Sequence, residues 1–347
     1  MRRILFVGLF ISQTFYGIAQ ILPNSSQNFQ FAPLYNPAFT GIEGYKDLKL
    51  SYRYQWTGLG SDAPKFINAS YNFRIKEPLD LTLNAIRTSM AKAQNNEIPK
   101  IKKVIHGLGV NVFSEQEKAI KRVGAGVNYS FHYPLMKQIR LAVGVNAAVY
   151  NIKIDPDELY FGKDDAGNPI NPNDDPVYRE LLAGSSYANL NMKAGFLVYA
   201  PRFYFGFSYL PIVNEAIVDV TTDADDIQTT IGKAQYYKGV IQAGYSFPVN
   251  PTMDVKPSIL ALWGMDNKFV IDYNVKVYIQ EKIWFGLTYR DVKSIAGIVG
   301  FNLNERLGAS YSYEISGSKL QTFSDGSHDL VLSVRLNNFK RQRQQTW

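Results

Sequence analysis

The chain has no cysteine and, beyond its N-terminus, no apolar run of about 18 residues or more, the length typical of a membrane-spanning helix. Without cysteine there are no disulfides and no thiol chemistry. The absence does not indicate the cellular compartment, because many exported proteins also lack cysteine. We expect no transmembrane helix in the mature chain. Histidine is scarce too, and its 3 copies lack the spacing of metal ligands.

The N-terminus is typical of a cleaved secretory signal. An Arg-Arg pair follows the initial methionine, and residues 4–11 form an apolar stretch too short to cross a bilayer. The small residues at positions 17–19 (Gly-Ile-Ala) predict cleavage before Gln20. We therefore assign residues 1–19 to a signal peptide. No cysteine follows the cleavage site, so lipid attachment there is not expected.

Aromatic residues are abundant, with 23 tyrosines and 21 phenylalanines. This enrichment favours strands, and it suits the aromatic belts of outer-membrane barrels. The net charge of +7 does not gather into a patch among aromatics. It collects in the tail near Lys340 and Arg343, which we interpret as a solvated end. No motif or groove-entering helix accompanies it, so we expect no nucleic-acid partner.

Alternation of apolar and polar residues is the main structural signal. After a turn-rich block over residues 36–41, one face of the first run carries Leu48, Leu50, Tyr52, Tyr54 and Trp56, and polar residues separate them. Such a period of two predicts a strand with one apolar face. The fifth run repeats it with Ile139, Leu141, Val143, Val145, Ala147 and Val149. We count about fourteen such runs, and single-chain bacterial barrels have an even number.

The connections between the runs alternate in length. Two long acidic loops are expected over residues 154–185 and 211–235. Tight links are expected at residues 134–138, 200–201, 248–251 and 280–282. Membrane barrels have short periplasmic turns and longer external loops, whereas a soluble β-sandwich has no reason to sort its loops in this way. An insertion over residues 75–104 is the exception, because it falls on the periplasmic side.

The sequence therefore predicts an all-β fold, a transmembrane antiparallel up-and-down β-barrel over residues 46–337. A pre-strand segment over residues 20–45 precedes it and could fold into the lumen as a plug. A basic tail over residues 338–347 follows. A soluble β protein is the alternative.

Signals for catalysis or metal binding are poor. Ser327, His328 and Asp329 include the residue types of a triad, but neighbours on a strand point to opposite faces and cannot form a relay. Residues 155–158 (Asp-Pro-Asp-Glu) lack the glycine and spacing of a calcium loop, so we favour solvated external loops over a Ca²⁺ site. The pairs at residues 107–109 and 124–126 (Gly-x-Gly) lack the third glycine of a nucleotide motif, and we place them on the inner face of a crowded barrel. No catalytic residue, cofactor or metal is predicted.

Six blocks resemble the PorP/SprF family, in the expected order. They are residues 31–41 (FAPLYNPAFTG), 52–58 (YRYQWTG), 63–65 (APK), 256–258 (KPS), 284–290 (WFGLTYR) and 324–329 (SDGSHD). This family consists of outer-membrane proteins of the type IX secretion system and gliding machinery of Bacteroidetes. The resemblance covers nearly all of the mature chain.

The resemblance implies a non-enzymatic role at the outer membrane. Its expected partners are a secreted cargo protein with a type IX C-terminal domain, such as a gliding adhesin, together with periplasmic or outer-membrane components of the machinery and outer-membrane lipid. The residues we assign to partner binding or to the plug are Tyr35, Asn36, Pro37, Gly41, Arg53, Gln55, Trp56 and Gly58. A diffusion pore or nutrient channel is the alternative, because fourteen strands enclose a lumen wider than side chains alone can fill.

Overall fold

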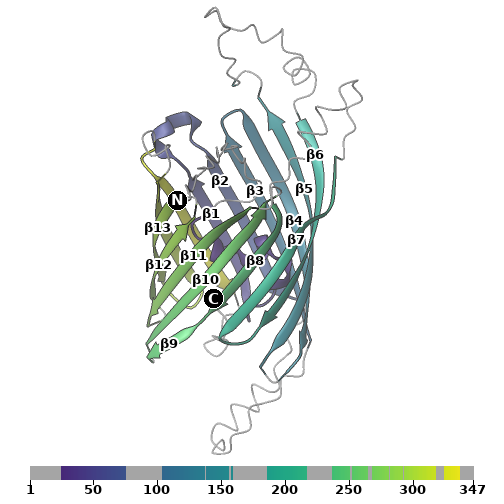
Figure 1. The fold of residues 1–347 in the computed structure, drawn as a ribbon, viewed down its shortest axis with the longest axis vertical. Helices are drawn as coiled ribbons and strands as arrows, with labels where there is room; N and C mark the ends of the chain where they lie inside the picture. The colour runs from purple at the N-terminus through teal and green to yellow at the C-terminus, as the bar shows by residue number, and fades with distance from the viewer. Residues whose placement is uncertain are drawn as a thin grey trace, which may run out of the picture.

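The chain forms one closed barrel of antiparallel strands (Figure 1). The computed structural model describes residues 25–75, 104–136, 138–155, 158, 186–216, 237–250, 252–264, 268–280, 282–291, 293–317 and 324–336. Its strands are β1 (Lys46–Tyr54), β2 (Lys65–Arg74), β3 (Ile105–Glu117), β4 (Ile120–Pro134), β5 (Arg140–Ile154), β6 (Ser186–Tyr199), β7 (Phe203–Ala216), β8 (Tyr237–Tyr245), β9 (Phe247–Asn250), β10 (Met253–Gly264), β11 (Phe269–Ile279), β12 (Ile283–Arg290), β13 (Ser294–Asn302), β14 (Leu307–Ser316) and β15 (Ser327–Leu336).

The wall is an up-and-down meander that closes on itself. Each strand pairs with its neighbours in the chain, and β1 pairs with β15 from Lys46↔Leu336 to Tyr54↔His328. The short β9 continues the line of β8 after a break at Ser246, and both pair with β10. The barrel therefore has 14 strand positions. This confirms the predicted fold class and strand count.

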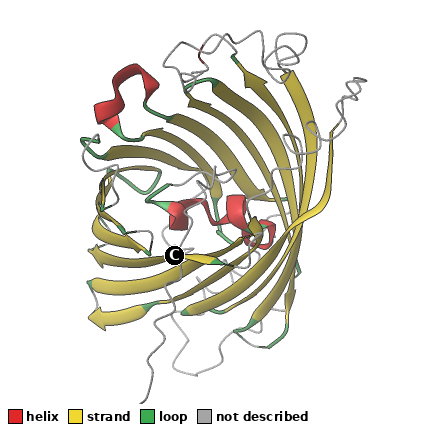
Figure 2. Cartoon of the chain, turned by 45° about the horizontal axis from the view of Figure 1, so that its top comes forward, coloured by secondary structure: helices red, strands yellow, loops and turns green. Residues whose placement is uncertain are grey.

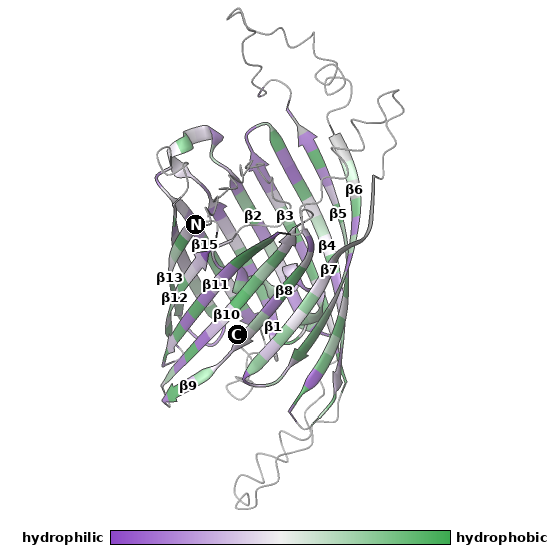
Figure 3. Cartoon of the chain, viewed as in Figure 1, coloured by the Kyte–Doolittle hydropathy of each residue, from purple (hydrophilic) through white to green (hydrophobic). Residues whose placement is uncertain are grey.

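The two faces of the wall have opposite polarity, as the alternation predicts. On β5, Val143 and Val145 are 49% and 50% exposed on the outside, whereas Asn146 is only 4% exposed inside. The same alternation follows the other strands as bands of contrasting hydropathy (Figure 3). On β12, the outward residues Phe285, Leu287 and Tyr289 are all apolar or aromatic and exposed. An apolar outer surface with a polar interior is the pattern that suits a barrel in a bilayer.

Residues 25–45, which we call the inner segment, lie inside the barrel (Figure 2). They contain three short helices, η1 (Asn28–Phe31), α1 (Ala32–Tyr35) and η2 (Pro37–Phe39). A fourth, η3 (Thr57–Asp62), follows β1 at the rim. None of the helices in the described ranges is long and apolar enough to cross a membrane.

The inner segment supplies apolar side chains to two buried clusters. The first holds Phe31, Tyr35, Tyr237, Val240, Leu260 and Val331. The second holds Ala38, Phe39, Ile42, Ala142, Leu197, Tyr199 and Tyr204. Each cluster joins the segment to strands on the wall, so burial of apolar surface holds the segment in the lumen.

The two ends of the barrel differ in their connections. The end at which β1 begins and β15 ends is called the proximal mouth here, and the other end the distal mouth. Short turns at the proximal mouth include the one closed by Leu135 N–H donating to Ile139 O at 3.0 Å. The two chain stretches that follow Ile154 and Ala216 leave from the distal mouth, as the loop sorting predicts.

One predicted loop boundary is wrong because β7 extends beyond the run of alternating residues that predicted it. Residues 211–216 belong to β7 rather than to a loop over 211–235. A register shift between Met192 and Ala194 lets β7 remain paired with β6 as far as Ala216. Such a bulge is not visible in a single strand's alternation.

A second boundary is wrong at the proximal mouth. Residues 248–250 lie in β9 and pair with β10, where a tight link over 248–251 was expected. Pro248 is typical of a turn, but proline is also tolerated in a strand next to a bulge, and the pairing of β9 with β10 has such an irregularity. The signal peptide over 1–19, residues 76–103 of the predicted insertion and the tail over 338–347 lie outside the described residues.

Candidate functional site

The middle of the inner segment is a tight turn whose side chains cap its own backbone. Asn36 is extended and precedes η2, and its side chain accepts a hydrogen bond from Ala38 N–H at 3.0 Å. Pro37 occupies the first turn of η2, where its missing N–H costs nothing. Gly41 then takes a left-handed φ of 71°, which ends the block. This explains the turn-rich composition of residues 36–41.

Asn36 also fixes the turn to the wall. Its Nδ2 donates to Phe196 O at 3.1 Å and to Phe207 O at 3.4 Å, on β6 and β7. The side chain is fully buried, so these bonds are made away from water. The contact needs glycine in the wall, because a Cβ at Gly195 would overlap the Asn36 side chain, and one at Gly144 would overlap the backbone of Pro37 and Ala38.

A buried polar cluster holds the next part of the segment. Thr40 O accepts from Ser130 Oγ at 2.5 Å and lies 2.8 Å from His132 Nε2. The other ring nitrogen of His132 lies 2.9 Å from the Tyr199 hydroxyl. With Nε2–H donating to Thr40 and Nδ1 accepting from Tyr199, every polar atom of the imidazole is satisfied. Ser130 Oγ also lies 3.0 Å from His132 Nε2, so the cluster holds the segment through three connected side chains.

The predicted inner-face glycines lie beside the same stretch. A Cβ on Gly107 would overlap the Thr40 carbonyl, and one on Gly109 would meet the Asn72 side chain and the Thr40 methyl. Gly124 and Gly126 also face inward. The predicted inner-face position of both Gly-x-Gly pairs is confirmed.

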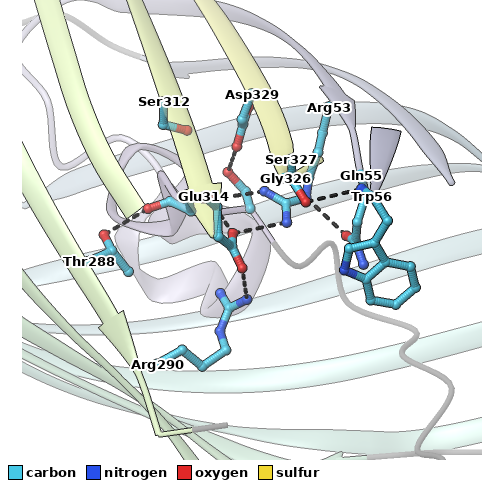
Figure 4. A network of polar contacts seen from close by, with 12 residues as sticks. Arg53, Gln55, Trp56, Thr288, Arg290, Ser312, Glu314, Gly326, Ser327 and Asp329 are labelled. Carbon is cyan, nitrogen blue, oxygen red and sulfur yellow. Dashed lines mark hydrogen bonds and ion pairs between the residues drawn. The ribbon is translucent and has the colours of Figure 1, made fainter. Parts of the chain in front are cut away.

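The start of the inner segment meets a network of buried charges (Figure 4). Arg53 on β1 donates to Glu314 Oε2 on β14 at 3.0 Å and to Ser26 Oγ at 2.9 Å. Ser26 in turn donates to the same carboxylate oxygen at 2.5 Å. Ser25 donates to Asp329 Oδ2 on β15 at 2.5 Å. Two consecutive serines thus attach the segment to three neighbouring strands.

The network continues along the inner face of the wall to β11 and β12. Arg290 binds Asp272 in a two-pronged pair, with Nε and Nη2 at 2.6 and 2.8 Å from its two oxygens. Arg290 Nη1 also lies 3.6 Å from Glu314 Oε1, which joins the two pairs. Asn28 donates to Asp272 Oδ2 at 2.6 Å, so a third residue of the segment reaches this network. Because these charges are buried, losing one partner leaves another charge uncompensated.

The predicted site residues fall into two groups. Tyr35, Asn36, Pro37 and Gly41 are all buried in the inner segment. Tyr35 packs in the first apolar cluster, and its carbonyl accepts from Ser208 Oγ at 2.8 Å. The structure therefore places this group inside the barrel rather than on a surface.

The second group runs from the network to the distal rim. Arg53 is 3% exposed and lies at the centre of the network, and its Nε donates to Gln55 Oε1 at 3.1 Å. Trp56 was expected to continue the strand, but it has a left-handed φ of 55° and precedes η3. The backbone N–H of Trp56 donates to Ser327 Oγ at 3.2 Å. Gly58 is exposed in η3.

Sequence reasoning missed the other charged members of the network that contains Arg53. Asp272, Arg290, Glu314 and Asp329 stand on polar positions of otherwise apolar strands, and this signal marks them as facing the lumen. Nothing in the sequence says which of them meet, because the pairs join residues as far apart as Arg53 and Glu314.

The stretch Ser327–Asp329 does not bring its three side chains to one face of β15. Ser327 and Asp329 face the lumen, whereas His328 lies on the other face, with Nδ1 2.6 Å from the Tyr311 hydroxyl. The predicted facing of these three neighbours, alternately in and out, is confirmed. Among the described residues, no group of three His, Asp or Glu side chains could hold a metal ion. Residues 156–157 and 159–185 of the acidic loop lie outside the described residues, so this finding on metal binding does not cover them.

A closed barrel with an apolar outer face, a polar inner face and a segment packed inside it defines the class: an integral β-barrel of the outer membrane. The model of one family, described as type IX secretion system membrane protein PorP/SprF, matches residues 17–334. The chain belongs to this family.

Three solved barrels are similar in structure. The toluene transporter TbuX of Ralstonia pickettii is 8% identical, with a TM-score of 0.49 over 89% of this chain and 93% of that one. The toluene transporter TodX of Pseudomonas putida is 7% identical, with a TM-score of 0.47 over 89% and 93%. Omp33 of Acinetobacter baumannii is 10% identical, with a TM-score of 0.43 over 86% and 100%. No curated protein sequence matches the chain.

Proposed function

We propose that this barrel supports the secretion or surface anchoring of large cargo proteins, such as gliding adhesins, by contacting other proteins. Membership of the type IX secretion family makes it an outer-membrane component of that system. The proposed role is non-enzymatic. Its partners are the cargo with its type IX C-terminal domain on one side and machinery components on the other.

The observation that carries this proposal is the inner segment. A pore needs a clear lumen, whereas residues 25–45 cross this lumen with almost every side chain buried or half-buried. Hydrogen bonds attach the segment to strands around the wall, including β4, β6, β7, β11, β14 and β15. A barrel filled in this way is better suited to a scaffold than to diffusion.

The connection lengths orient the scaffold. The long connections after Ile154 and Ala216 leave the distal mouth, whereas the proximal mouth has one long connection, after β2, and otherwise short turns. We therefore place the proximal mouth in the periplasm and the distal mouth outside. Recognition usually lies in loops held by a rigid framework. The distal mouth is then the place for cargo, and the proximal mouth for periplasmic machinery.

Deleting the gene tests the proposal in the cell. We expect one or a few large proteins to disappear from the cell surface or medium, while uptake of small solutes stays normal. Complementation with the intact gene must restore them. An unchanged surface proteome together with a specific uptake defect would establish the pore alternative instead.

Photocrosslinking tests the two mouths separately. A crosslinking residue in place of Leu59, which is exposed in η3 at the distal mouth, should capture cargo. The same residue in place of Leu303, exposed by 74% in a proximal turn, should capture a periplasmic partner. Leu287 on the outer face is the matched control and should give lipid adducts only. The same captured protein from both mouths would contradict the assigned sides.

Conductance tests the lumen itself. In a planar bilayer, we expect the intact barrel to conduct poorly and a version lacking residues 20–45 to conduct measurably. Large, steady conductance from the intact protein is the result that would favour the pore.

A further inference from the structure

A cavity of about 70 Å³ lies between the inner segment and the wall near the proximal mouth. Asp47 and Arg335, which face each other across β1 and β15, line it close to the ends of these strands. Phe29, Glu43 and Tyr278 also line it and are only half-buried, so the cavity communicates with solvent at this end. None of the hydrogen bonds that tie the segment to the charge network at Arg53 passes through it.

The lining carries more positive than negative charge. Lys49, Lys276 and Arg335 face it together with the carboxylates of Glu43 and Asp47. Lys49 and Asp47 already neutralise each other at 2.6 Å. Lys276 and Arg335 are then opposed by Glu43 alone. The balance is positive before any ligand is considered.

Lys276 is the unusual member of this lining. Its side chain is 3% exposed, yet within the described part of the chain its ammonium makes no hydrogen bond and no ion pair. It lies 4.4 Å from the centroid of the Phe29 ring, 5.4 Å from that of Tyr278 and 5.9 Å from that of Trp284. Aromatic faces stabilise a cation in part, but a buried ammonium ordinarily also has an anion or hydrogen-bond acceptors.

Part of the remaining lining is apolar, beside the polar side chains of Gln30 and Asn72. The inner segment contributes this apolar part through Ala32, Pro33, Phe39 and Ile42. A water molecule needs roughly 10–15 Å³ on this measure of volume, so the space suits a group of about five heavy atoms. Such a site has a place for a negative charge and a place for a short hydrocarbon chain.

We propose that this cavity is a binding site for an organic carboxylate, whose charged group lies between Lys276 and Arg335 and whose hydrocarbon part lies against the inner segment. A charge-assisted hydrogen bond from each cation would hold the two carboxylate oxygens. The ligand enters from the proximal mouth. A free short-chain acid and the C-terminal carboxylate of a peptide share this chemistry.

Calorimetry on the purified full-length mature barrel in detergent tests the site. Sodium butyrate is the probe for a free acid, acetyl-Gly-Ala the probe for a peptide terminus, and butyramide the neutral control. We expect saturable binding of a carboxylate and none of butyramide. Stronger binding of the peptide than of butyrate identifies a protein terminus as the source, and the reverse identifies a free acid. Binding of inorganic phosphate alone, or no saturable binding at all, overturns the proposal.

Variants locate the binding. Lys276→Met should weaken carboxylate binding by about 10- to 100-fold, the loss of one hydrogen bond to a charged group. If Lys276→Met does not fold, Arg335→Met tests the same cavity, because Arg335 also lines it and is only half-buried. Lys193→Met is the matched control, because Lys193 is a buried inner-face lysine that donates to Leu34 O outside this cavity. Equal binding by wild type and a folded Lys276→Met or Arg335→Met variant refutes the site.

Discussion

Removing Arg53 should loosen the start of the inner segment without opening the wall. Its guanidinium makes three contacts, to Ser26 Oγ at 2.9 Å, Glu314 Oε2 at 3.0 Å and Gln55 Oε1 at 3.1 Å. Breaking a buried ion pair typically costs about 3–5 kcal/mol. In Arg53→Met, Glu314 keeps Arg290 at 3.6 Å and the Ser26 hydroxyl, so we expect the lower end, about 3 kcal/mol.

Glu314→Gln should cost more than Arg53→Met. It removes the carboxylate that stands between Arg53 and Arg290, and only Arg290 retains another bound carboxylate, that of Asp272. We therefore expect the free energy of unfolding to fall by about 5 kcal/mol, the upper end of the range for a broken buried pair. The double variant should cost less than the sum of the two, with a coupling of about 1–3 kcal/mol, because the residues are in contact.

The assay is equilibrium unfolding by urea of the full mature barrel in lipid vesicles, followed by tryptophan fluorescence. Arg122→Met is the matched control, because Arg122 forms a comparable pair with Glu115 at 2.8 Å on the wall. Displacement of the segment is measured separately by maleimide labelling of Ala38→Cys, a fully buried position in a chain without native cysteine. Arg53→Met should speed this labelling and Arg122→Met should not. Additive costs, or equal labelling rates, would refute this account of the network.

Two further predictions concern the outer face and pH. Leu287→Arg should destabilise the barrel in a bilayer by about 2–4 kcal/mol, because Leu287 lies between the outward rings of Phe285 and Tyr289 on β12. Leu303→Arg should cost only about 0–1 kcal/mol, because Leu303 is in a turn. Equal costs for the two variants would contradict the assigned outward position of Leu287. Burial, followed by the Asp47 charge, raises the pKa of Glu43 to about 7 against the opposing effect of nearby Lys49, Arg335 and Lys256. The folded state then holds this proton more tightly, so stability should fall as pH rises from about 4.5 to about 7. Glu43→Gln should flatten that fall in unfolding midpoints measured between pH 4 and pH 8, and an unchanged slope would exclude Glu43 as its cause.

The wall could be predicted from the sequence because each strand carries its own evidence. On β5 the alternation alone places Val143 outside and Asn146 inside, and both positions are confirmed. The strand that ends at Ala216 was cut short for a physical reason: its pairing depends on a bulge in the neighbouring strand β6. Local patterns predict which face a residue is on, and they fail where a partner strand decides how far pairing continues.

The interior could not be predicted in the same way. The turn block of residues 36–41 was recognisable, but its position depends on Gly144 and Gly195, which are more than a hundred residues away and have no pattern of their own. The pairing of Arg53 with Glu314 has the same difficulty. Strand alternation marks both as inward, and only the closed barrel brings them to 3.0 Å.

The polarity of the wall decides what it would cost to displace the inner segment. If residues 25–28 left their sites, Asp272, Glu314 and Asp329 would lose hydrogen bonds from the segment, but water entering from the mouths could replace these, and the pairs to Arg290 and Arg53 belong to the wall itself. Glu314 and Asp272 would keep their arginine partners, so the large penalty of an uncompensated ion does not apply to them. Asp329 is the exception, because it has no ion pair among the described residues and would depend on water in place of Ser25. The principal cost is the apolar surface of Phe31, Tyr35 and their cluster. The burial of this apolar cluster, rather than the charge network, therefore contributes most to keeping the segment in the lumen.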